Sequence, residues 1–323
     1  MTAPAGAGFL DRRLLFFSGK GGVGKSTVTA AAALLAAERG RRVLLVEVDA
    51  KGHLTALFEQ PPVGFEPREV YPGVFAMQMR TEQALREYLK LQLRVPVFAR
   101  LGPLASALDF VATAAPGVRE ILTVGKVCAE VRDSIEGRAD WDLVVVDAAA
   151  TGHIVSQLDS PRAIQDLVAV GPVRQQTEWM LELLADRKTT ALHVVTTPEE
   201  MPVNETIALV RQARTELVVP FGSVIVNRVL PEPFTKGDEP VFEALLASPA
   251  RDVLEADVGA GAGDVLEATR LAVSMRRSRA GHLARLRSEL DVPLVYLPYL
   301  FVRDSGLRVT RMVADHLAAE LGL

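Results

Sequence analysis

GKGGVGKST, residues Gly19–Thr27, is the stretch that decides the fold of this 323-residue chain. It fits the pattern G-x-x-x-x-G-K-[ST], a loop whose backbone N–H groups surround the phosphates of a nucleotide. The apolar run Leu14–Phe17 before it is of strand type, and the Ala- and Leu-rich stretch after it predicts a helix from Val28 to Arg39 that stops at Gly40. A strand, this loop and a helix in that order predict a nucleotide-binding α/β domain.

The residue types of this loop suit phosphate binding. Glycine lets the backbone approach oxygen atoms that a Cβ would obstruct, and a helix that begins near Lys25 directs its free N–H groups at the anion. Lys25 is expected to reach the β- and γ-phosphates, and the hydroxyl of Ser26 to bind Mg²⁺ directly. Lys20 is an extra cation where an ordinary phosphate loop accepts almost any residue. The loop residues expected to bind the nucleotide are Gly19, Lys20, Gly21, Gly22, Val23, Gly24, Lys25, Ser26 and Thr27.

A glycine-rich turn with two solvated lysines is the alternative interpretation of this loop. It is the weaker one, because the motif is trusted where a strand precedes it and a helix follows it, as they do here.

Composition indicates a soluble enzyme with a large core. Hydrophobic residues make up 49% of the chain, its formal net charge is −4, and Cys128 is its single cysteine. No run reaches the length of about 18 apolar residues that a membrane span needs, and the first residues lack the layout of a signal peptide. We therefore expect a cytoplasmic protein with at most peripheral membrane association, and the charge gives no reason to expect nucleic acid. One cysteine excludes an internal disulfide, and we interpret Cys128 as a buried core residue.

Strand-like runs alternate with helical stretches along the chain, which predicts a doubly wound, mostly parallel sheet flanked by helices. The helical stretches in residues 80–135 and 154–190 are expected to form a helical subdomain inserted in a single domain of residues 1–323. A last helix is expected from Leu307 to Leu321. The expected strands are Leu14–Ser18, Val43–Val48, Val74–Met79, Leu143–Val146, Leu192–Thr196, Val224–Val226 and Leu294–Leu297.

Two aspartates follow two of these strands directly. Asp49 comes after Val43–Val48, and Asp147 comes after Leu143–Val146. Ligands of a doubly wound sheet bind outside the carboxyl ends of the strands, so both carboxylates should face the phosphate loop. There a carboxylate orders Mg²⁺ or its waters, or orients an attacking water. The alternative is that each aspartate only caps the next helix.

The loop with Lys20 resembles the deviant Walker A loop of the SIMIBI-class ATPases. The other motifs resemble the subgroup that contains the arsenite-pump ATPase and the ATPase that targets tail-anchored membrane proteins, in a bacterial branch. Residues 49–54, DAKGHL, are similar to its switch I, and residues 147–153, DAAATGH, to its switch II. Further similar segments are PGVRE at 116–120, TPEE at 197–200, NET at 204–206 and VNRVLP at 226–231.

This resemblance implies a P-loop NTPase fold and a Mg²⁺-dependent ATP hydrolase that closes as a dimer over two ATP molecules. Lys20, Lys25 and Asp49 would be catalytic, with Lys20 crossing to the phosphates of the partner subunit and Asp49 activating or positioning water. Asp49 and Asp147 would support Mg²⁺ through bound water, and Asp147 with Gly152 would belong to switch II. Asn227 would recognise adenine, although a strand-end turn is the commoner use of an asparagine. The client of such an ATPase stays unknown.

The two switches depart from the family pattern. Lys51 and Gly52 stand where Ala and His are usual, and Ala148 and Ala150 stand where Thr and Pro are usual. Because these loops sense the γ-phosphate by ordering around it, the departures predict slower hydrolysis or a different dimer partner. Three functions therefore stay open: an ATPase homodimer, a weakly active subunit of a heterodimer with a paralogous ATPase, and a positioning ATPase similar to MinD and ParA.

Other candidate sites are weaker. Cys128 alone cannot supply a cysteine zinc clamp or a soft metalloid site, and His53 and His153 in separate loops do not make a metal site. A run of arginines near the end of the chain fits a solvated helix face better than a lipid or nucleic-acid site. That run contains Arg276, Arg277, Arg279, Arg285 and Arg287.

Overall fold

A computed structural model describes residues 8–49, 52–93, 117–137, 141–232, 234–235, 237–259, 261–303 and 305–323. Ala50 and Lys51 of switch I, and residues 94–116 of the predicted helical subdomain, which include Pro116 of the PGVRE segment, lie outside these ranges.

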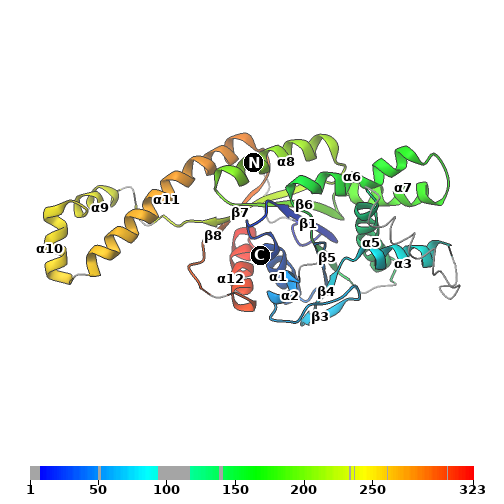
Figure 1. The fold of residues 1–323 in the computed structure, drawn as a ribbon, viewed down its shortest axis with the longest axis horizontal. Coiled ribbons are helices and arrows are strands. Elements are labelled where there is room, and N and C mark those ends of the chain that lie inside the picture. Colours follow the sequence, from blue (N-terminus) through cyan, green and yellow to red (C-terminus); the bar gives the residue numbers. More distant parts are fainter. Residues whose placement is uncertain are drawn as a thin grey trace.

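Eight strands form one sheet in the order β3-β4-β2-β5-β1-β6-β7-β8 (Figure 1). All neighbouring strands are parallel except β3 and β4, so the predicted doubly wound, mostly parallel α/β fold is confirmed. The strands are β1 Leu14–Gly19, β2 Val43–Glu47, β3 Arg68–Tyr71, β4 Val74–Gln78, β5 Leu143–Asp147, β6 Thr190–Thr196, β7 Phe221–Val229 and β8 Leu294–Pro298.

β3 is the strand that the sequence did not predict. Its four residues, REVY, include two exposed charged side chains, and only Val70 is buried. Such a strand has no apolar run, because a strand at the edge of a sheet pairs on one side only and is commonly protected by charge. The seven predicted strands are confirmed and differ from the observed bounds by up to three residues.

Helices cover both faces of the sheet, and β1 shows why. Leu14 and Phe16 face a core shared with α5, α6, α7 and α8, whereas Leu15 and Phe17 face a core shared with α1 and α12. This alternation follows from the two-residue period of a strand. The helices are α1 Lys25–Glu38, α2 His53–Ala56, α3 Thr81–Leu93, α5 Val118–Ile135, α6 Thr151–Leu167, α7 Pro172–Ala185, α8 Glu200–Glu216, α9 Glu239–Leu245, α10 Ser248–Val258, α11 Gly261–Glu289 and α12 Leu307–Leu321.

The helices α3, α5, α6 and α7 pack on one another at one end of the molecule (Figure 1). The predicted helical stretch of residues 154–190 is divided in two, since Gly171 has a φ of 104° and Pro172 begins α7. Pro is favoured at the first position of a helix and cannot continue a preceding one. Cys128 of α5 is fully buried in the core, as predicted, and burial raises the pKa of its thiol to about 12.

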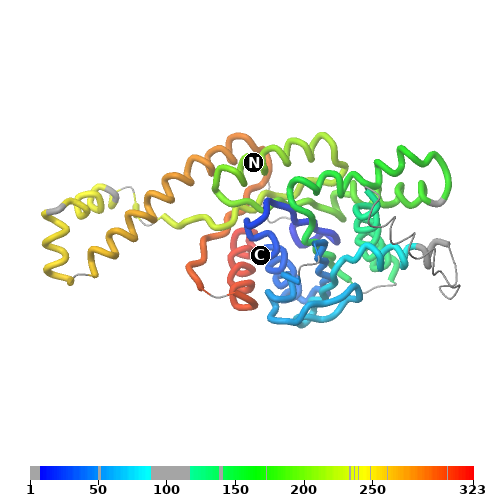
Figure 2. The backbone as a smooth tube through the Cα atoms, in the orientation of Figure 1, coloured from blue at the N-terminus to red at the C-terminus, as the bar shows by residue number. Residues whose placement is uncertain are grey.

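The helices α9, α10 and α11, hereafter the arm, extend from the opposite end of the molecule (Figures 1 and 2). α11 has 29 residues, which gives it a length of about 44 Å. A small cluster that includes Phe242, Leu266 and Val273 joins α9 to α11. No sequence motif had indicated this arm. None of the described helices combines the length and the apolar character that crossing a bilayer requires.

The five arginines of α11 contact other groups of the chain. The arginine side chains and their partners are Arg276 with Glu232, Arg277 with Glu243, Arg279 with Glu199, Arg285 with Asn204, and Arg287 with the Tyr296 hydroxyl. These contacts dock α11 on its neighbours, so the basic run has a structural use that the sequence analysis did not foresee.

Candidate functional site

The loop Gly19–Thr27 lies at the carboxyl end of β1, between β5 and β6, and leads into α1. Two of its glycines are required by close packing. A Cβ at Gly19 would overlap the carbonyl oxygen of Val195, and a Cβ at Gly24 would overlap the side-chain amide of Asn227. Gly24 also has a φ of 87°, which side chains rarely tolerate. The loop is thus a tight backbone turn placed against β6 and β7, and Thr27 lies in the first turn of α1.

Asp147, at the end of β5, lies beside this loop. The parallel register of β1 and β5 places Phe17, two residues before the loop begins, opposite Asp147. The Lys25 ammonium contacts Asp147 Oδ1 and donates to the carbonyl of Ala148 at 2.6 Å. The Ser26 hydroxyl donates to Asp147 Oδ2, also at 2.6 Å. Three residues that were singled out separately in the sequence therefore converge, and the Asp147 side chain is only 6% exposed.

Asn227, near the end of β7, supports the phosphate loop from the other side. Its Nδ2 donates to the carbonyl of Val23 at 2.9 Å, and its Oδ1 accepts from the backbone N–H of Arg228 at 2.9 Å. Arg228 has a φ of 57°, and the pairing of β7 with β8 shifts register between Val226 and Val229, so the strand is irregular here. Asn227 thus lies at an irregular position within β7 and contacts the phosphate loop, and the strand-end turn of the alternative interpretation is not observed. Its adenine-binding role stays a prediction.

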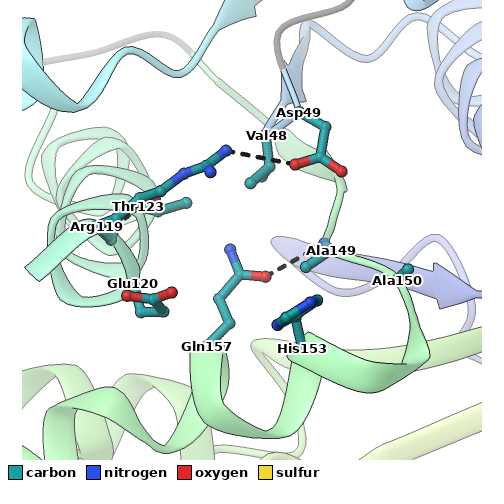
Figure 3. Close-up of a pocket in the computed structure, with 9 residues that line it drawn as sticks. All are labelled: Val48, Asp49, Arg119, Glu120, Thr123, Ala149, Ala150, His153 and Gln157. Carbon is teal, nitrogen blue, oxygen red and sulfur yellow. Dashed lines mark hydrogen bonds and ion pairs between the residues drawn. The ribbon is translucent and has the colours of Figure 1, made fainter. Parts of the chain in front are cut away.

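Asp49 lies beyond the end of β2, on a cavity of about 320 Å³ (Figure 3). Its Oδ1 is 3.4 Å from a guanidinium nitrogen of Arg119 in α5, and both side chains are about half exposed. The first turns of α5 and α6 and the segment after β5 complete the cavity wall, with His153 and Gln157 of α6 on the side opposite Asp49 (Figure 3). Asp49 therefore lies on a cavity whose wall includes Ala149 and Ala150, and its carboxylate is paired with Arg119 of α5. That this carboxylate faces the phosphate loop stays a prediction.

Glu47, which the sequence analysis passed over, fixes the other end of switch I. It is 3% exposed. Its carboxylate accepts from the backbone N–H groups of Gly52 and His53, at 3.2 and 2.9 Å, and from the side-chain amide of Gln78 at 2.9 Å. A charged residue inside the apolar run VLLVEV was the available signal, because a buried carboxylate requires partners of this kind.

Gln157 and Ser18 hold the switch II backbone after β5. The Ala149 N–H donates to Gln157 Oε1 at 3.3 Å, and the Ser18 hydroxyl donates to the Ala149 carbonyl at 2.8 Å. Gly152 follows in the first turn of α6. No sequence signal separated Gln157 from the other polar residues of that helix.

Lys20 points to α8 of its own chain. Its ammonium contacts Glu205 Oε1, and the Thr151 hydroxyl donates to Glu205 Oε2 at 2.8 Å. The hydrogen bond from Lys20 is the main reason that the pKa of Glu205 is lowered. Glu205 had been noted within a similar segment but had been given no role.

Side chains that commonly bind metal ions do not gather in groups of three in the described part of the chain. Among those residues, no group of three or more His, Cys, Asp or Glu side chains is placed to hold a metal ion. His53 and His153 lie in different switches, with His153 on the cavity of Asp49.

Several known proteins are similar to this chain. The family model described as the anion-transporting ATPase matches residues 12–176 and 167–248. The ATPase BagA of Mycobacterium tuberculosis is 38% identical over 225 residues, which are 68% of this chain and 66% of that protein. A putative arsenical pump-driving ATPase of Halobacterium salinarum is 30% identical over 252 residues, 72% of this chain and 38% of that protein. The ATPase GET3 of Podospora anserina is 29% identical over 161 residues, 48% of this chain and 46% of that protein. The match thus spans about two thirds of the mycobacterial relative and less than half of the other two.

Proposed function

The chain belongs to the anion-transporting ATPase family, and we propose that it hydrolyses ATP with Mg²⁺ as a dimer whose nucleotide-driven opening and closing binds or transfers a client. The convergence of Lys25, Ser26 and Asp147 at the ends of the neighbouring strands β1 and β5 is the observation that carries this proposal. These are the cation, the hydroxyl and the carboxylate that phosphoryl transfer in phosphate-loop enzymes uses.

The reaction assigns a function to each group of the site. The oxygen of a water molecule bonds to the γ-phosphorus, the bond from that phosphorus to the bridging oxygen breaks, and ADP, inorganic phosphate and a proton result. Asp49 positions the water, and Lys25 binds the β- and γ-phosphates. Lys20 supplies a second cation to the phosphates bound by the partner subunit, as charge develops during transfer. Asn227 is proposed to contact adenine once the nucleotide is in place.

The residues present fit Mg²⁺, because this ion prefers hydroxyl, carboxylate and water oxygens. The Ser26 hydroxyl would bind it directly, and Asp147 and Asp49 would hold its waters; Ser26 and Asp147 already lie within hydrogen-bond distance of each other. When bound, the ion would neutralise charge on the phosphates.

Phosphate release by the purified chain tests the activity. We expect turnover of ATP that requires Mg²⁺ and that falls to background in Lys25→Met. Lys188→Met, which changes an exposed lysine before β6, is the matched control and should keep the wild-type rate. A wild-type chain without Mg²⁺-dependent turnover, or Lys25→Met with undiminished turnover, would contradict the proposal.

A heterodimer with a paralogous ATPase is the second candidate, and the altered switch residues Ala148 and Ala150 favour it. Purification of the native protein, followed by identification of the chains that accompany it, decides between the two dimers and also gives the client. The third candidate, a positioning ATPase on an anionic membrane, receives no support from the arginines of α11, because they contact groups of the chain itself.

A further inference from the structure

Glu205, in the first half of α8, contacts two segments of the candidate site at once. One carboxylate oxygen contacts the Lys20 ammonium of the phosphate loop, and the other accepts from the hydroxyl of Thr151 at 2.8 Å. Thr151 is the first residue of α6 and lies within residues 147–153, the stretch similar to switch II. A single side chain of α8 therefore joins the phosphate loop to switch II.

α8 holds Glu205 in a fixed place. Val203 and Thr206 on either side of it are buried against the sheet, so Glu205 itself points away from the core. Two residues of the same part of the chain, Glu199 and Asn204, contact arginines of α11 at 3.2 and 2.9 Å. The carboxylate is thus positioned by packed helices, whereas Lys20 belongs to a loop.

The contact between Lys20 and Glu205 is suited to exchange. Both side chains are 32% exposed, and ion pairs that are open to water are weak. The phosphates of a nucleotide carry more negative charge than one carboxylate and offer more acceptor oxygens, so they are the stronger partner for an ammonium group. A bound nucleotide can therefore displace Glu205 from Lys20.

We propose that Glu205 is a positioning residue that retains Lys20 within its own subunit before the dimer closes, and that Lys20 must leave Glu205 to reach the partner's phosphates. This inference rests on the proposed function, in which Lys20 acts across the dimer interface. Thr151 couples the release to switch II: when that segment reorders around the γ-phosphate, the carboxylate loses its second hydrogen bond and Lys20 is freed. Nucleotide binding and presentation of Lys20 thereby become one event.

Glu205→Gln tests this, because it keeps the shape of the side chain and removes its charge. Sedimentation velocity of the full chain with Mg²⁺ and a non-hydrolysable ATP analogue gives the protein concentration at which half of it is dimeric. We expect this concentration to fall about two- to fivefold in Glu205→Gln, the range that an exposed ion pair supports. Glu200→Gln, an exposed position on the same helix, is the matched control and should behave as wild type. Thermal unfolding followed by circular dichroism verifies that each variant is folded.

Lys20→Ala identifies the group on which Glu205 acts. If Glu205 restrains Lys20, adding Glu205→Gln to Lys20→Ala leaves dimerisation unchanged relative to Lys20→Ala alone. A gain that persists without Lys20, or no gain in Glu205→Gln, overturns the inference and leaves the proposed function intact. A wild-type chain that binds a fluorescent ATP analogue but stays monomeric instead overturns the proposed dimer, and this inference with it.

Discussion

The central strand β1 and the arm differ in how they are held in place. Every residue of β1 is buried, whereas the arm is held by ion pairs on its surface and by a small cluster that includes Phe242, Leu266 and Val273. The strand lies between two helical layers and ends in the phosphate loop; the arm extends away from the sheet with valines such as Val253 and Val258 exposed. Residues in a close-packed layer have few places to move, so their register fixes the position of a side chain such as Asp147. The candidate site therefore lies on the rigid, close-packed sheet, while the arm is a locally weaker unit.

Phe17→Ala should have the largest effect in this comparison. Phe17 is fully buried and packs against Phe9 and His193, so its loss leaves a cavity and should lower the free energy of unfolding by about 3–5 kcal/mol. Phe242→Ala in the arm should loosen the arm and lower the main transition less. Urea unfolding measures both variants, and equal losses would remove the distinction between the two regions.

Asp147→Asn should have the second-largest effect, and the effect is on activity rather than on stability. The amide keeps the shape of the carboxylate but loses its charge toward Lys25 and its match to Mg²⁺, and we expect kcat/KM for ATP to fall by about 100-fold or more. Asp257→Asn, an exposed position in α10 of the arm, is the control and should leave kcat/KM unchanged. Steady-state phosphate release measures kcat/KM for both variants. A loss of kcat/KM of less than threefold in Asp147→Asn would count against the assigned site.

His193 should make the sheet sensitive to acid. Burial, with a smaller contribution from the charge of Arg12, lowers the pKa of His193 from 6.5 to about 3. The unfolded chain therefore binds a proton near pH 6.5 that the folded chain does not bind until about pH 3. Titration of His193 therefore leaves the free energy of unfolding unchanged above pH 6.5. Below that pH it lowers the free energy of unfolding, by about 2 kcal/mol at pH 5.

Urea unfolding at pH 7.5 and pH 5 checks this expectation. His193→Gln should lose less stability than wild type between the two pH values, because the titrating group is gone. His316→Gln, an exposed position on α12, is the matched control and should keep the wild-type difference. An unchanged pH difference in His193→Gln would show that another group is responsible.

Arg279→Gln should have the smallest effect, because it removes one contact where the arm meets the segment before α8. The guanidinium of Arg279 reaches Glu199 before α8 at 3.2 Å, a contact whose loss should lower global stability by less than about 1 kcal/mol. Hydrogen exchange measured by mass spectrometry should become faster in α10 and α11 and stay unchanged in β1 and β5. Faster exchange in the central strands would mean that the arm and the sheet open together.

Most of the sheet could be predicted because its strands are apolar runs buried on both faces, as Val43–Glu47 and Leu143–Asp147 are. β3 could not be predicted, because exposed charged residues such as those of β3 are also typical of a loop. The arm could not be predicted either, since α11 has few buried residues, such as Leu266 and Val273, and none of the six residues between these two is buried. The position of the arm also depends on distant partners. Family membership agreed with the resemblance of the phosphate loop and the switches.

The chemical groups of the site follow from the amino-acid sequence. A phosphate loop is a local device, since its glycines, Lys25 and Ser26 are adjacent in the chain and need only a strand before them and a helix after them. Which distant groups meet that loop depends on how the strands and helices pack together. Asp147 arrives through the pairing of β5 with β1, and Glu205 meets Lys20 across 185 residues because α8 packs beside β6 and β7. The reason is the separation along the chain over which each interaction acts. Backbone conformation is set by near neighbours, whereas the order of strands and the docking of helices are set by the burial of the whole core.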